Sequence, residues 1–218
     1  LVLVFLPDER ITDEARERPR PSFGKVLSNK LLRAAFIYRA VGALGRGSVM
    51  GFLSIYLSIP VAEGGLGLSL SMIGLILSVS QLVSAFSQGP FGELADRYNK
   101  IGLTVLGGVL GSVGLLLIPL TNNVWEVIGA QLVFTVGGAL GMPALTALVA
   151  IEGRELGIGT TMSVLQSAMS VGMIAGPLAS GILGDMFGLR IIFVIGSSIT
   201  LLGTALFYVL QRSPDRKP

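Results

Sequence analysis

The chain has 218 residues, of which 51% are hydrophobic and only 13% are charged. Soluble domains carry about 25% charged residues, and the few polar residues here could not cover a soluble core, so the composition favours a membrane protein. Cys and His are absent, which excludes disulfides, Cys/His metal sites, thiol catalysis and histidine acid–base chemistry. The net charge of +3 is small and its basic residues gather in a few loops, which is typical of membrane topology rather than nucleic-acid binding.

The first 30 residues differ in character from the rest. Residues 1–6 are apolar but lack the basic start and the long apolar core of a signal peptide. We interpret them as the end of a transmembrane helix that begins upstream. Residues 7–30 contain five acids and three prolines and cannot bury a core, so we expect a cytoplasmic linker that is flexible or forms a surface helix.

Six apolar runs follow, separated by short polar or glycine-rich links. A helix needs roughly 20 residues to cross the hydrocarbon layer, and runs of this length fit helices rather than barrel strands. The sequence therefore predicts an all-α membrane protein with a six-helix bundle over 31–211 and a cytoplasmic tail over 212–218. The predicted spans are 31–59, 68–91, 101–120, 124–150, 158–183 and 190–211.

Basic residues predict the orientation of these spans. If 7–30 is cytoplasmic and the links alternate sides, 13 of the 16 basic residues lie on the cytoplasmic side. Arg190 alone lies outside, while Arg39 and Arg46 fall inside the first span. By the positive-inside rule the linker and the C-terminus are cytoplasmic, and we expect the inner membrane of a prokaryote.

A charged motif lies between the second and third spans. Residues 92–97 read Gly-Glu-Leu-Ala-Asp-Arg, which resembles the cytoplasmic-loop signature of the major facilitator superfamily, Gly-x-Leu-Ala-Asp-Arg-x-Gly-Arg-Arg. Asn99 stands where the second Gly is usual and Ile101 where a basic residue is usual. Since Asn tolerates the left-handed backbone conformation, we expect the turn to be kept.

The resemblance implies a gating role for Gly92, Asp96 and Arg97. In the family this Asp is thought to hold one conformation by interacting with a helix N-terminus and a neighbouring Arg. Such a contact contributes roughly 0.3–1 kcal/mol when exposed, which is enough to bias a two-state equilibrium. The alternative is an ordinary solvated turn.

A second motif lies in the fifth span. Its sequence, Gly172-x-x-x-Gly176-Pro177-x-x-Ser180-Gly181, resembles the Gly-Pro antiporter motif of the same family. Drug antiporters carry the diagnostic copy in the fifth helix of the whole protein, whereas this copy would lie in the eleventh, so it supports the family more than the efflux subclass. We expect Gly172, Gly176 and Gly181 to serve helix packing and Pro177 to bend its helix.

The family plan implies that the six spans are helices 7 to 12 of a twelve-helix transporter. The chain would be the C-terminal half, built as a 3+3 inverted repeat, and its partner would be a six-helix N-terminal half. Helices 7, 8, 10 and 11 would line the substrate cavity, with helices 9 and 12 outside.

Charged and polar residues inside the spans are candidates for a substrate path. Arg39 and Arg46 share one helical face; we expect Arg39 to snorkel to the inner interface. Arg46, about 10 Å deeper, would bind an anionic group or an acid of the missing half, or else bond helix carbonyls. Stripes at helical spacing include Gln81, Gln131 and Gln166. For each glutamine the alternative is an interhelical hydrogen bond.

These observations predict secondary active transport of a small molecule by alternating access. Efflux antiport is the first candidate and uptake of a metabolite or anion the second; a non-transporting membrane scaffold or sensor is the alternative of another class. We expect no enzyme activity, because no paired deep carboxylates are present, and no cofactor or metal. The expected partners are the lipid bilayer and a small-molecule substrate, not nucleic acid.

Overall fold

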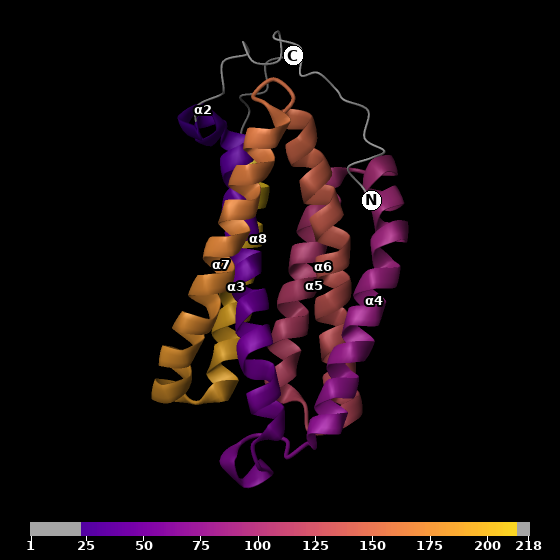
Figure 1. The fold of residues 1–218 in the computed structure, drawn as a ribbon, viewed down its shortest axis with the longest axis vertical. Helices are drawn as coiled ribbons and strands as arrows, with labels where there is room; N and C mark the ends of the chain where they lie inside the picture. Colours follow the sequence, from indigo (N-terminus) through magenta and orange to yellow (C-terminus); the bar gives the residue numbers. More distant parts are fainter. Residues whose placement is uncertain (1–22, 213–218) are drawn as a thin grey trace, which may run out of the picture.

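The computed structural model describes residues 23–212, and these form a bundle of long helices (Figure 1). Each of the six long helices is apolar and long enough to cross a membrane. The all-α six-span prediction is thereby confirmed, while the expectations for 1–6, for 7–22 and for most of the tail lie outside the described residues. The six helices are α3 (Lys30–Ser58), α4 (Leu70–Arg97), α5 (Lys100–Leu117), α6 (Val124–Glu152), α7 (Ile158–Phe187) and α8 (Leu189–Arg212).

The links alternate between the two ends of the bundle. A short helix, α2 (Phe23–Ser28), lies at the same end as the α6–α7 link, and we call this the α2 end (Figure 1). Asn29 caps α3 there, accepting from two backbone N–H groups, and its Nδ2 donates to Glu152 Oε1 at 2.9 Å. This bond joins the start of α3 to the last residue of α6. The far end holds the 3₁₀ turns η2 (Val61–Glu63) and η3 (Ile118–Leu120).

The helix pairings repeat with inverted direction. α3 packs against α7 and α8, α6 packs against α4 and α5, and α5 packs against α8. Exchanging α3, α4 and α5 for α6, α7 and α8 in order reproduces the same set of pairs, although α3 runs away from the α2 end and α6 runs towards it (Figure 1). The second helix of each triplet also carries a Gly-Pro pair about 20 residues from its start, ending in Pro90 and Pro177. The described bundle is thus a 3+3 inverted repeat.

Glycines allow two of these pairs to approach closely. A Cβ built on Gly107 would lie 2.5 Å from the backbone nitrogen of Gly141, and one built on Gly137 would overlap the backbone of Gly111, so α5 and α6 touch backbone to backbone. At the α3–α7 crossing, a Cβ on Gly172 would overlap the carbonyl oxygen of Ala40. In lipid, where apolar burial between helices gains little, such close packing drives association.

Two clusters of buried apolar residues lie towards the two ends of the bundle, one at each end. The cluster near the α2 end includes Phe36, Tyr38 and Phe207, and the Tyr38 and Phe207 rings lie 5.3 Å apart. The far-end cluster includes Tyr56 and Phe193, whose ring centroids are 5.4 Å apart. On α3 the first cluster ends at residue 38 and the second begins at residue 49, so Arg39 and Arg46 fall between them.

The link expected over 92–100 is mostly helical. α4 continues to Arg97, and only Tyr98 and Asn99 separate it from α5. Asn99 has φ −63° and ψ 109°, so the expected left-handed conformation is wrong. Its side chain instead accepts from the backbone N–H groups of Ile101 and Gly102, which is the ordinary role of Asn at a helix N-terminus.

Candidate functional site

A cavity of about 540 Å³ occupies the middle of the bundle, at the level between the two apolar clusters. Its walls come mainly from α3, α4, α5 and α6. The polar and charged side chains on these walls are Tyr38, Arg39, Arg46, Ser80, Gln81, Ser84, Gln88, Gln131, Thr135, Thr146 and Thr200. No acid belongs to the described wall, and this volume falls in the range of small-molecule sites.

Three pairs of charged, polar or sulfur-containing lining side chains lie seven residues apart on one helix. The pairs are Arg39/Arg46 on α3, Gln81/Gln88 on α4 and Thr135/Met142 on α6. Seven residues are two helix turns, so each pair shares a face and is separated by about 10 Å along the axis. In each pair, the residue nearer the far end (Arg46, Gln81 or Thr135) lies about 17 Å along its helix from that end. The cavity therefore has an Arg46 tier (Arg46, Gln81, Thr135) and an Arg39 tier (Arg39, Gln88, Met142).

Arg46 has no partner within the described part of the chain. Neither a hydrogen bond nor an ion pair joins its half-buried side chain to any residue of 23–212. A charge inside a span costs about 2.5–3.5 kcal/mol on insertion scales. Either of the partners suggested by the sequence, an anionic group or an acid of the missing half, would offset this cost.

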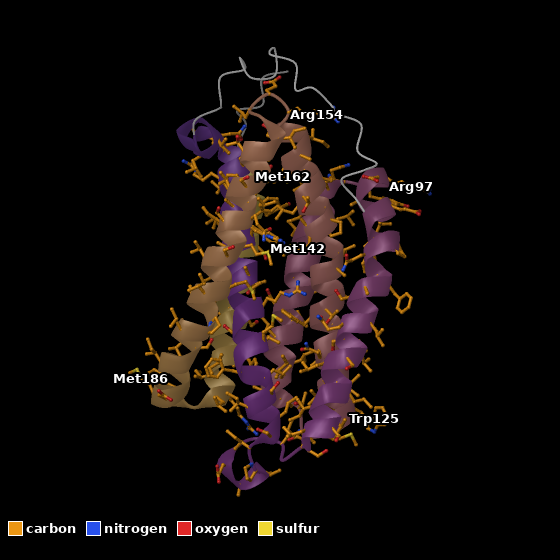
Figure 2. All side chains as sticks on the ribbon, in the orientation of Figure 1. Arg97, Trp125, Met142, Arg154, Met162 and Met186 are labelled. Carbon is orange, nitrogen blue, oxygen red and sulfur yellow. The ribbon has the colours of Figure 1, made fainter. Side chains whose placement is uncertain are left out.

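Arg39 contacts two neighbouring helices inside the bundle, and its snorkelling to the interface stays a prediction. Its Nη1 contacts Met142 Sδ of α6, its Nη2 donates to Met169 Sδ of α7 at 3.0 Å, and its Nε is buried without a partner among the described residues. Figure 2 shows Met142 in the middle of the bundle, far from either end. The side chain lines the cavity, where methionines of two neighbouring helices provide sulfur acceptors.

Gln131 lies on the cavity wall but is almost fully enclosed. Its side chain is 5% exposed, and its Oε1 is buried without a hydrogen-bond partner in the described structure. A buried polar atom without a partner costs about 1–3 kcal/mol. Such an amide is a candidate for contact with a bound molecule, and the alternative, an interhelical hydrogen bond of Gln131, is absent within 23–212.

Helix α5 contributes to the cavity, although the family plan placed its equivalent outside. It does so through glycines alone, Gly107, Gly108 and Gly111. A glycine exposes backbone and leaves space, so this wall adds room rather than a polar side chain. No glutamine or charge was needed for α5 to line the cavity.

Gln166 lies outside this cavity, on the exposed face of α7. Its Nε2 donates weakly to Met169 Sδ at 3.7 Å, while Ser163, Ser167 and Ser170 each bond a carbonyl one turn back in their own helix. The polar stripe on α7 was found by its spacing, but its exposed side chains face no other described helix.

The glycine motif of α7 lies against α3. Gly172 and Gly176 meet the backbone of Ala40 and Leu44, and Gly181 faces Phe52 at 3.7 Å. Pro177 packs against Gly47, where an added Cβ would lie 3.0 Å from its ring. Beside this crossing, Ser180 Oγ donates to Ser48 Oγ at 2.7 Å, and both hydroxyls are buried.

The charged motif at the end of α4 has only a weak internal contact. Arg97 lies 3.9 Å from Glu93, one turn back, and both side chains are about three-quarters exposed. Asp96 is exposed and makes no hydrogen bond or ion pair with the described residues. Figure 2 shows Arg97 at the end of α4 near the α2 end. Since Asn99 already caps α5, the N-terminus that Asp96 would contact is not that of α5.

Comparisons with known proteins agree with this architecture. The Major Facilitator Superfamily profile matches residues 2–218. Among curated proteins, the chain is 30% identical over 167 residues to Multidrug resistance protein MdtG of Serratia proteamaculans and 32% identical over the same length to that of Citrobacter koseri. Each match covers 75% of this chain but only 40% of the relative, so the chain spans less than half the length of these proteins.

Solved structures support the fold. A crystal structure of a peptide transporter in complex with alafosfalin aligns with a TM-score of 0.78 at 21% identity, covering 89% of this chain and 40% of that one. A transporter of the same group in complex with 5-aminolevulinic acid gives 0.79 at 19% identity. These relatives and neighbours are transport and resistance proteins rather than enzymes. The chain thus belongs to the Major Facilitator Superfamily and is an integral, multi-pass membrane protein.

Proposed function

We propose that this chain is one six-helix half of a secondary active transporter that moves a small molecule by alternating access. The observation that carries the proposal is the polar cavity in the middle of the bundle, which along α3 lies between the two apolar clusters. A structural scaffold has no need of such a cavity. The other half of the transporter would pack on α4 and α7, whose spans are only 17% buried in the chain alone, against 44% for the other four.

Efflux antiport is the first candidate for direction. It is supported by the relatives, which are called multidrug resistance proteins. The described cavity wall contains no carboxylate, so a proton carrier would lie in the other half. The α2 end would face the cytoplasm of a prokaryote, because the links there hold most of the basic residues.

The experiment is reconstitution of the full-length protein in liposomes. An imposed proton gradient should drive accumulation of at least one solute from a panel of anionic, neutral and cationic dyes. Gln81→Leu should reduce that transport several-fold, whereas Ser71→Ala, a control on the same helix outside the cavity, should not. If no solute moves under any ion gradient, a scaffold or sensor role replaces the transporter.

Uptake of a metabolite or anion is the second candidate. It is favoured by one observation, the two cavity arginines without an acid beside them on the described walls. The same liposomes separate the directions: uptake moves solute and coupling ion the same way, and antiport moves them in opposite ways.

Asp96 and Arg97 would act as a conformational latch through groups outside residues 23–212. Asp96→Asn should therefore slow transport while leaving the stability of the fold unchanged, because the side chain has no described partner to lose. Transport equal to the unmodified protein would reduce the motif to a solvated helix end. The orientation has its own test, because Tyr98→Cys labelled from outside intact cells would overturn it.

A further inference from the structure

We propose that the cavity selects anionic small molecules, with Arg46 as the anion-binding residue and Arg39 and Gln131 as supporting groups. This inference rests on the proposed transport function, since it names the substrate class. The class comprises organic molecules that carry a carboxylate, phosphate or sulfonate. It depends on neither the direction of transport nor the coupling ion.

The first step is the charge of the walls. Two arginines line one cavity, and the described residues offer neither of them a carboxylate. Arg39 makes only sulfur contacts, which leave its positive charge uncompensated. Neutral residues complete the polar part of the wall. Walls of low dielectric around charges of one sign raise the local concentration of the opposite ion.

The second step is that the two arginines differ in their contacts, which indicates different roles. Arg39 is held between Met142 of α6 and Met169 of α7, so its position is set by the bundle. Arg46 is free of such contacts and shares its tier with Gln81 and Thr135. A guanidinium without a partner offers its fork of N–H donors to an oxyanion. The geometry assigns direct binding to Arg46 and a longer-range attraction to Arg39.

The third step is hydrogen bonding beside the anion. Gln131 makes no hydrogen bond within the described chain, and the atom that is buried without a partner is its acceptor, Oε1. Its NH₂ group and that of Gln81 are donors, as an oxyanion requires. No cation-binding carboxylate competes with them on the described walls.

The test measures the electrostatic selectivity of the cavity itself. The chain has no cysteine, so in full-length protein stripped of other cysteines, Ser84→Cys places one thiol on the cavity wall, between the two tiers. Its labelling rates with anionic sulfonatoethyl and cationic trimethylammonioethyl methanethiosulfonate are compared in detergent. Ser71→Cys, on the same helix outside the cavity, corrects for the reagents.

The expected anion preference at Ser84→Cys is about tenfold or more over Ser71→Cys. One unit charge across a helix spacing of about 10 Å, at an effective dielectric near 20, changes a local ion concentration by roughly that factor. Arg46→Gln should lower the preference several-fold and Arg46→Lys should keep it. Arg33→Gln, an exposed arginine of the same helix that does not line the cavity, should change nothing.

The result that would overturn the inference is a thiol that shows no anion preference, or one that Arg46→Gln leaves unchanged. Either would mean that an acid elsewhere in the full-length protein neutralises the arginines. Because labelling requires no transport, its outcome is separate from that of the liposome assay. An anion-selective cavity in a protein that moves no solute would refute the proposed transport and leave the binding preference standing.

Discussion

Replacing Gly172 by alanine is expected to destabilise the bundle at the α3–α7 crossing. An added Cβ would overlap the carbonyl oxygen of Ala40 and lie 2.8 Å from the Cβ of Ala43. Neither obstacle is the end of a flexible side chain, so relief requires the two helices to separate. Overpacking of this kind typically costs about 1–3 kcal/mol. Separation would also stretch the buried hydrogen bond between Ser48 and Ser180.

The measurement is the free energy of unfolding of the purified full-length protein, obtained by titration with a denaturing detergent. Gly74→Ala is the matched control, because it makes the same chemical change within α4 at a position where an added Cβ meets nothing within 4 Å. Alanine favours a helix over glycine by about 1 kcal/mol, so the control should be unchanged or slightly more stable. If Gly172→Ala were as stable as Gly74→Ala, the crossing would be looser than the structure shows, and the packing role of the glycine motif would be rejected.

The same titration checks three further expectations. Asn99→Ala should cost about 1 kcal/mol, because α5 loses its N-cap; no loss would contradict that cap, and Asn99→Ser should restore most of the stability. A double-mutant cycle of Ser48→Ala and Ser180→Ala should give a coupling of about 0.6 kcal/mol, typical of interhelical hydrogen bonds in membranes; zero coupling would mean that each hydroxyl bonds only within its own helix. Gln131→Leu should stabilise the fold by up to about 1 kcal/mol, since it removes a buried polar atom without a partner, while liposome transport falls; a less stable variant with normal transport would contradict both statements.

Most of the fold could be predicted from the sequence because apolar runs in a membrane protein leave few alternatives. Every backbone polar group must be satisfied inside the span, and only helices of sufficient length do so here. The errors concern helix ends. Charges in the last turns of α4 suggested a loop after residue 91, yet the helix continues to Arg97. Beyond the hydrocarbon layer a helix can carry charged residues, so hydropathy marks the membrane boundary rather than the end of the helix.

Site residues could be predicted only where a single polar or charged side chain in an apolar span carries an energetic cost. Arg46, Gln81 and Gln131 stood out because polar groups in an apolar span need a reason, and all three line the cavity. The contacts of Arg39 could not be predicted because its methionine partners belong to helices more than 100 residues away in sequence. The cavity position of Met142 was missed altogether, although its seven-residue spacing from Thr135 carried the signal.

The two inverted repeats differ in how the glycines of their equivalent helices, α4 and α7, are packed. On α7, Gly172 and Gly176 bring the backbone against α3. On the equivalent helix α4, Gly74, Gly89 and Gly92 meet nothing within 4 Å among the described residues. The two repeats share the Gly-Pro pair but differ in the residues around it. A fold built from two copies with opposite orientation has two related crossings, and a difference in their closure is what alternating access requires.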